Sequence, residues 1–82
     1  MNIEQFKDYE QILDTQENLI KQLNATKEKR NKIVEQFKQD KNYDEFDNQL
    51  FLLEIEVQSI TKKMQENFEK IKKLQSELND NQ

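Results

Sequence analysis

One short segment carries oxygen ligands at the spacing of a calcium-binding loop. Asp40, Asn42 and Asp44 match the first half of an EF-hand. Such a loop also needs a glycine at its sixth position, for a sharp turn, and a bidentate glutamate at its twelfth. Here those positions hold Glu45 and Phe51. The sequence therefore predicts a solvated acidic turn with a helix cap and no specific metal site.

Paired carboxylates are the other candidates for chemistry. Glu54 and Glu56 could serve as acid and base if a cleft controlled their protonation. The chain has no histidine and no cysteine, so it lacks the commonest general base and the thiolate nucleophile. Two packed helices form a ridge rather than a cleft. We therefore predict a protein that is not an enzyme and that needs no cofactor.

The composition indicates long helices with a polar surface. Of the 82 residues, 37% are charged and 33% hydrophobic, and no glycine or proline is present to break a helix. The net charge of −4 and the shortness of the basic stretch at residues 27–32 argue against a nucleic-acid partner. No apolar run is long enough to span a bilayer, and no signal peptide opens the chain. We expect a cytoplasmic protein, although leaderless export is compatible with these features.

The spacing of the hydrophobic residues predicts the fold in more detail. In each half of the chain, apolar residues recur at alternating intervals of three and four, the heptad pattern of a coiled coil. The seam of the first half is Phe6, Tyr9, Leu13, Gln16, Ile20, Leu23, Lys27, Arg30, Val34 and Phe37. The seam of the second half is Tyr43, Phe46, Leu50, Leu53, Val57, Ile60, Met64, Asn67, Ile71, Leu74 and Leu78. Periodicity sustained over this length predicts two long helices.

The two heptad frames do not join. Continuing the first frame would place its next seam position at Lys41, whereas the second frame begins at Tyr43. Asn42, followed three residues later by Glu45, resembles a capping box at the start of a helix. Asp40 or Asn42 can adopt the left-handed conformation that ends a helix. We therefore predict a single hairpin in residues 1–82, with one helix over about residues 3–38, a turn at about 39–41 and a second helix over about 42–79.

Folding the chain at residue 40 pairs the two seams with each other. Facing residues then lie at equal distances from residue 40, as Phe37 and Tyr43 do next to the turn. No facing pair joins two polar residues. The pairing of Leu13 with Asn67, however, leaves a buried amide without an obvious hydrogen-bond partner.

Charge favours the same antiparallel arrangement. The acidic residues 4–17 would lie beside the lysine-rich residues 62–77, and the basic residues 27–38 beside the acidic residues 41–56. A parallel dimer of the same helices would instead set like charges together. The predicted fold is all-α: two long helices in an antiparallel coiled-coil hairpin, completed by oligomerisation or by a partner.

Two groups of apolar residues lie off the predicted seams. One group falls on the side of the second helix that points away from the first helix, and the other flanks the seam of the first helix. An isolated hairpin would leave both groups exposed, which is unusual for so polar a chain. We predict that a partner protein or another copy of the chain covers them. The predicted partner-binding residues are Phe51, Leu52 and Ile55 on the second helix and Ile12, Leu19 and Ile33 on the first.

These features favour a non-enzymatic coiled-coil module. The leading hypothesis is a small structural or adaptor subunit that acts in the assembly of a larger protein complex. One alternative is a small acidic helical secretion chaperone or accessory protein. Another is an acidic regulator that binds an enzyme through the turn.

The hairpin prediction can be tested with spin labels at Phe6 and Leu74. In a hairpin the two positions lie on neighbouring helices, whose axes are about 8–10 Å apart. In one continuous helix they would lie nearly two helix lengths apart, roughly 100 Å at 1.5 Å per residue. Pulsed dipolar spectroscopy measures the separation, and a value near the longer distance would disprove the hairpin.

Overall fold

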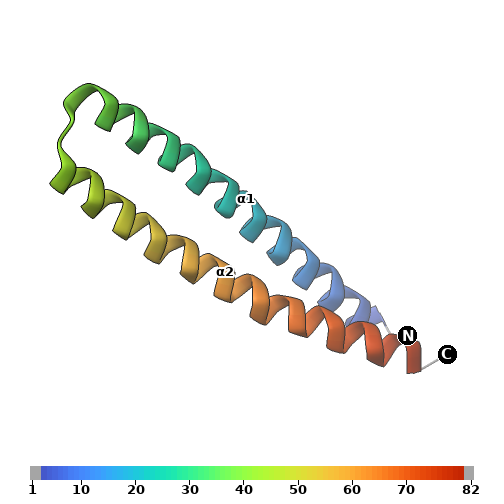
Figure 1. Ribbon diagram of the computed structural model, residues 1–82. Coiled ribbons are helices and arrows are strands. Elements are labelled where there is room, and N and C mark those ends of the chain that lie inside the picture. Colours follow the sequence, from blue (N-terminus) through green and yellow to red (C-terminus); the bar gives the residue numbers. More distant parts are fainter. Residues whose placement is uncertain (1–2, 81–82) are drawn as a thin grey trace.

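The computed structural model describes residues 3–80 and contains two antiparallel helices (Figure 1). Helix α1 spans Ile3–Asp40 and helix α2 spans Tyr43–Asp80. The predicted all-α hairpin is therefore confirmed. Helix α1 ends two residues later than predicted, helix α2 is shifted by one residue at both ends, and the link between them is residues 41–42 rather than 39–41. The outermost residues of the predicted 1–82 unit lie outside the described residues.

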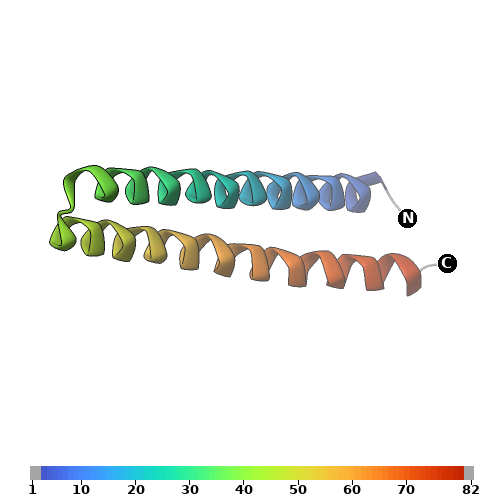
Figure 2. The ribbon, with the colours of Figure 1, turned by 45° about the horizontal axis from the view of Figure 1, so that its top comes forward.

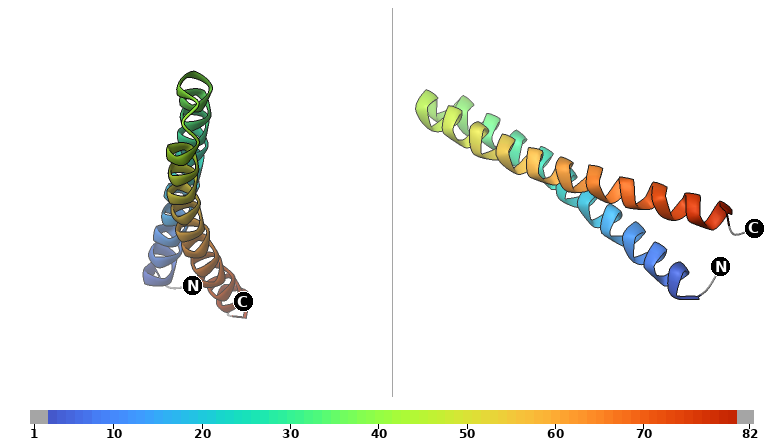
Figure 3. Two further views of the ribbon diagram at one scale, coloured as in Figure 1. Left: turned by 60° about the vertical axis from the view of Figure 1, so that its left-hand side comes forward. Right: turned by 90° about the horizontal axis from the view of Figure 1, so that it is seen from below.

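The hairpin is a rod. Its Cα atoms extend over 61 × 14 × 14 Å, as expected for helices of this length packed side by side. The helices accompany each other along their whole length (Figure 2), and views from other sides show them crossing at a shallow angle (Figure 3). Such a rod has a single layer of contact between its helices. A side chain is therefore either in that layer or largely in contact with solvent.

Two adjacent caps make the turn. Lys41 has a left-handed backbone, with a φ of 52°, and its N–H donates to the Phe37 carbonyl at 2.7 Å. This bond closes the last turn of α1. The Oδ1 of Asn42 accepts a hydrogen bond from the Glu45 N–H at 3.3 Å and so caps the start of α2. The predicted cap at Asn42 is confirmed, whereas the left-handed residue is Lys41 rather than Asp40 or Asn42.

An aromatic cluster joins the helices beside the turn. The ring of Phe37 stacks on Phe46, with centroids 4.4 Å apart, and meets the edge of Tyr43 at 4.9 Å. Tyr43 is nevertheless 68% exposed, so it belongs to the rim of the seam rather than its interior. Phe37 and Phe46 thus form the layer nearest the turn, and the facing residues of the two helices are placed symmetrically about the link at residues 41–42.

From Phe46 onward the seam of α2 is the predicted one, but the seam of α1 is displaced by one residue at every second position. Along α1, Leu19 and Thr26 are buried, whereas Ile20 and Lys27 are exposed. The prediction that Phe6, Leu13, Ile20 and Lys27 lie in the seam is therefore wrong. The buried and half-buried residues of α1 are Gln5, Tyr9, Ile12, Gln16, Leu19, Leu23, Thr26, Ile33, Val34 and Phe37.

In the observed seam, the buried amide of Asn67 has hydrogen-bond partners on α1. Asn67 is 7% exposed, and its Nδ2 donates to the side-chain Oε1 of Gln16 and to the backbone carbonyl of Ile12, each at 3.0 Å. The expected pairing with Leu13 would have left this amide without a partner. The other buried polar residue, Thr26, donates its hydroxyl hydrogen bond to the carbonyl of Leu23 within its own helix.

The left-handed residue at the turn leads to a stability prediction. A non-glycine residue at positive φ carries a steric cost that glycine does not. We expect Lys41→Gly to raise the free energy of unfolding by about 1 kcal/mol, measured as a higher midpoint in urea or heat. Lys41→Ala is the matched control, because it removes the charge but keeps the Cβ. Equal gains from both variants would show that charge, and not backbone conformation, limits the turn.

The buried amide leads to a second stability prediction. Asn67→Ala should lower the free energy of unfolding by about 1–3 kcal/mol, because it removes a buried amide with two hydrogen bonds and leaves the half-buried side chain of Gln16 without this partner. Replacing both residues together, as Gln16→Leu with Asn67→Leu, should recover that loss or exceed it. Urea unfolding followed by circular dichroism measures both effects. The exposed Asn18→Ala serves as the control, and a loss as large as that of Asn67→Ala would contradict the role given to the buried pair.

Candidate interaction surfaces

Oxygen atoms at the acidic turn accept one helix-capping hydrogen bond and two side-chain hydrogen bonds. The carboxylate of Asp40 accepts from the amide of Gln36, the amide oxygen of Asn42 caps α2, and the carboxylate of Glu45 accepts from Gln49 at 3.1 Å. Across the described residues, no group of three or more acidic side chains is arranged to hold a metal ion. Asp40 is the last residue of α1, and Asn42 caps the first turn of α2.

The side chains of Phe51, Leu52 and Ile55 form an exposed patch on the outer face of α2, which we call the distal patch. Their exposures are 60%, 58% and 49%. Ile55 follows Phe51 by four residues and Leu52 by three, so it neighbours both on the helix surface and the three side chains are contiguous. The seam residue Leu53 between them is buried against α1. The distal patch therefore lies outside the contact layer of the hairpin and is exposed, as predicted from the sequence.

A shallow groove between the helices adjoins the distal patch. Its apolar lining comes from Ile33 of α1 and from Leu52 and Leu53 of α2. Its rim includes Lys29 and Glu56, whose side chains form an interhelical ion pair with Nζ and Oε1 2.9 Å apart. Leu52 belongs to both features, so the groove and the distal patch make one continuous surface.

The predicted partner-binding residues of α1 occupy a different place from the one expected. Leu19 is buried at 6% exposure, and Ile12 and Ile33 are half-buried in the seam. The expectation that they flank the seam is wrong, because the seam runs through them. Ile33 alone also reaches an open surface, where it lines the groove beside Leu52. The structure thus brings Ile33 together with the distal patch and separates Ile12 and Leu19 from it.

A second apolar surface lies near the chain termini and was not predicted. Phe6, Leu13 and Ile20 of α1 are 46%, 41% and 44% exposed, and Phe68 of α2 is 47% exposed. We call these four residues the proximal strip. Sequence reasoning missed it because it placed the three α1 residues inside the seam. Their regular spacing of seven was visible, but only the correct frame of α1 shows that the spacing marks an exposed edge.

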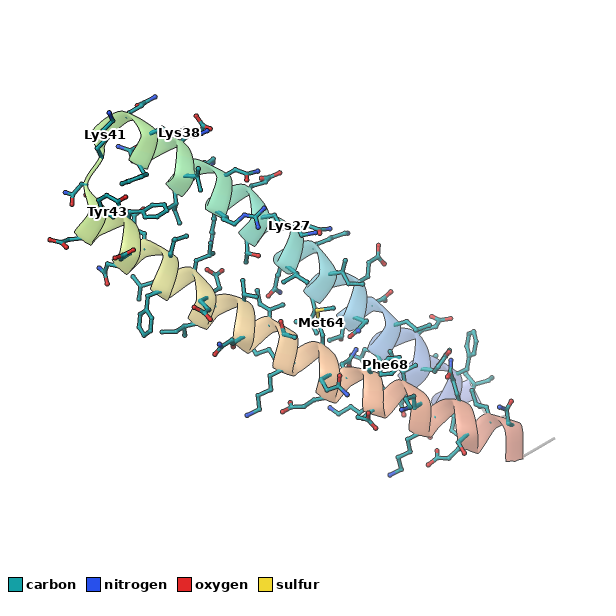
Figure 4. The ribbon with its side chains drawn as sticks, in the orientation of Figure 1. Lys27, Lys38, Lys41, Tyr43, Met64 and Phe68 are labelled. Carbon is teal, nitrogen blue, oxygen red and sulfur yellow. The ribbon has the colours of Figure 1, made fainter. Side chains whose placement is uncertain are left out.

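The polar contacts between the helices set the position of these surfaces. Lys29 bonds to Glu56 towards the turn, Asn67 bonds to Gln16 in the other half, and the amide of Gln75 donates to the Tyr9 hydroxyl at 3.1 Å. Figure 4 shows Met64 of α2 pointing into the space between the two helices. The distal patch and the proximal strip therefore lie in opposite halves of one rod with a fixed register.

Neither helix, over the described residues, combines the length and the apolarity needed to cross a membrane. Comparisons with models of protein families, with curated proteins and with solved structures found no match for the chain. The two exposed apolar surfaces are therefore the observations on which a function can be proposed.

Proposed function

We propose that the protein is a non-enzymatic coiled-coil interaction module, a small structural or adaptor subunit that binds another protein through the distal patch. The observation that supports this most directly is the exposure of three contiguous large apolar side chains, Phe51, Leu52 and Ile55. The hairpin leaves all three largely in contact with solvent, and only Leu52 lies beside α1, where it lines the groove with Ile33. The cytoplasmic location belongs to the same proposal and rests on sequence composition.

The shape of this surface suits a helical partner. An amphipathic helix could place its apolar side chains on the distal patch and along the groove lined by Ile33 and Leu53. Lys32 stands on the rim of that groove and would favour an acidic residue beside the partner's apolar face, whereas the charge of Lys29 is already paired with Glu56. Each large apolar side chain that becomes fully covered would contribute about 1.5–3 kcal/mol.

The proposal predicts that charges in the distal patch abolish partner binding and leave the helices intact. In the variant Phe51→Asp with Ile55→Asp, neither substituted residue contacts the seam, so the far-ultraviolet circular dichroism should change little. Proteins recovered with the native chain by affinity purification should be lost from the variant. Recovery of the same proteins by the variant would overturn the distal patch as the binding surface.

A matched control separates lost apolar contact from added charge. Asn48→Asp with Gln58→Asp adds the same two charges to the exposed outer part of α2 but removes no apolar side chain. This control should recover the partners that the native chain recovers. A collapse of helicity in the Phe51 and Ile55 variant, with normal helicity in the control, would instead place those residues in the core of the hairpin.

A further inference from the structure

The proximal strip occupies one edge of the hairpin. Lys29 and Glu56, which bond to each other, each precede a seam position of their helix. Leu13 and Phe68 each follow one, since Ile12 and Asn67 lie in the seam and are hydrogen bonded to each other. In an antiparallel pair of helices, residues that precede the seam share one edge and residues that follow it share the other. Leu13 and Phe68 therefore lie level with each other on the edge opposite the Lys29–Glu56 ion pair.

The two edges differ in chemistry. The positions that recur every seven residues with Lys29 and Glu56 are polar throughout both helices: Asp8, Thr15, Gln22, Lys29 and Gln36 on α1, and Gln49, Glu56, Lys63, Lys70 and Glu77 on α2. The opposite edge carries the whole proximal strip, and beyond Ile20 it changes to Lys27 on α1 and Glu54 on α2. An apolar strip confined to one edge is typical of a helix pair that packs against further helices on that side.

The exposed area of the hairpin is large for its mass. The chain has a mass of 10.0 kDa and exposes 6711 Å². A compact protein of that mass exposes about 5,200 Å², and one of twice the mass about 8,700 Å². Two hairpins that packed as compactly as a globular protein would bury roughly 4,000–5,000 Å² in total. Even half of that area exceeds the roughly 1,200–2,000 Å² of a standard stable interface.

Charge identifies another copy of the chain as the occupant of this edge. Around the proximal strip, α1 is acidic and α2 is basic: residues 4–17 carry five acidic side chains against one lysine, and residues 62–73 carry five lysines against two glutamates. A second copy of the hairpin carries the same acidic segment on α1 and the same basic segment on α2, side by side at the same position along the rod. If α1 of each copy lies over α2 of the other, acidic segments meet basic segments. If α1 lies over α1, acidic segments meet each other.

We propose that two copies stack through the proximal strip, with their turns at the same end and α1 of each over α2 of the other. The product is an antiparallel four-helix bundle with a twofold axis along the rod. Leu13 of each copy then lies over Phe68 of the other and forms a central apolar layer. Further towards the turn, Lys27 of each copy lies over Glu54 of the other. The distal patch on the outer face of α2 stays free, so the dimer does not depend on the proposed partner binding.

The first test is the mass of the protein in solution. Sedimentation equilibrium should give twice the chain mass of 10.0 kDa at micromolar concentration. In Leu13→Asp with Ile20→Asp it should give the mass of one chain. The matched control is Gln11→Asp with Asn18→Asp, which adds the same charges at nearly the same heights on the outer face of α1 and should remain dimeric. A native chain that sediments as a monomer at about 100 μM would overturn the proposal, and so would a Leu13 and Ile20 variant that stays dimeric.

The second test measures the orientation and does not depend on the folding of a disruptive variant. Because the chain has no cysteine, Lys38→Cys allows one spin label per copy near the turn. With the turns at the same end, the two labels lie on diagonally opposed helices, less than about 40 Å apart. With α1 over α1 and the turns at opposite ends, they lie about 75 Å apart at 1.5 Å per residue. A single short distance in pulsed dipolar spectroscopy supports the proposed stacking, and the long distance overturns it.

Discussion

The amide of Asn67 must be hydrogen bonded, because it lies in the contact layer between the two helices at 7% exposure. The apolar residues of α1 would accept more than one register, since large apolar side chains stand next to each other at residues 12–13, 19–20 and 33–34. The polar residues of α1 and α2 are compatible with fewer registers. When Gln16 lies opposite Asn67, the amide is satisfied, Thr26 enters the seam and the charged Lys27 stays outside. A single polar pair in the seam, Gln16 and Asn67, thus selects one register among several that hydrophobic packing alone would tolerate.

The position of the turn and the register of the two helices depend on each other. A link at residues 41–42, rather than one centred on residue 40, changes which residue of α1 faces each layer of α2. The change requires α1 to continue to Asp40 and a lysine to adopt positive φ at Lys41. The steric cost at this residue is on the order of 1–2 kcal/mol. The hydrogen bonds of the Asn67 amide and the aromatic layer of Phe37 and Phe46 offset it.

The features that could be predicted from sequence are those marked by one unambiguous pattern or by two patterns that agree. Helix α2 has one apolar stripe, so its seam and the outward direction of Phe51, Leu52 and Ile55 followed from periodicity alone. The antiparallel direction was supported by periodicity and charge together. Helix α1 has two adjacent apolar stripes of similar strength, so counting apolar positions could not decide which one faces α2. The proximal strip was missed for that reason. The left-handed conformation of Lys41 has no sequence signal, because lysine has no special preference for it.

The doubling of the apolar stripe on α1 also explains why the hairpin exposes what it does. One partner helix can cover only one stripe, so burying Ile12 and Leu19 against α2 necessarily turns Leu13 and Ile20 towards solvent. Four apolar side chains are buried in the described chain, namely Leu19, Leu53, Ile60 and Ile71, which is a small core for two helices of this length. A molecule that binds the second apolar stripe of the folded chain would therefore raise its stability, and would do so more at higher concentration. Since the proximal strip and the distal patch lie on different faces and in opposite halves of the rod, covering one leaves the other accessible. The same two helices can therefore be stabilised by one contact and bind through another.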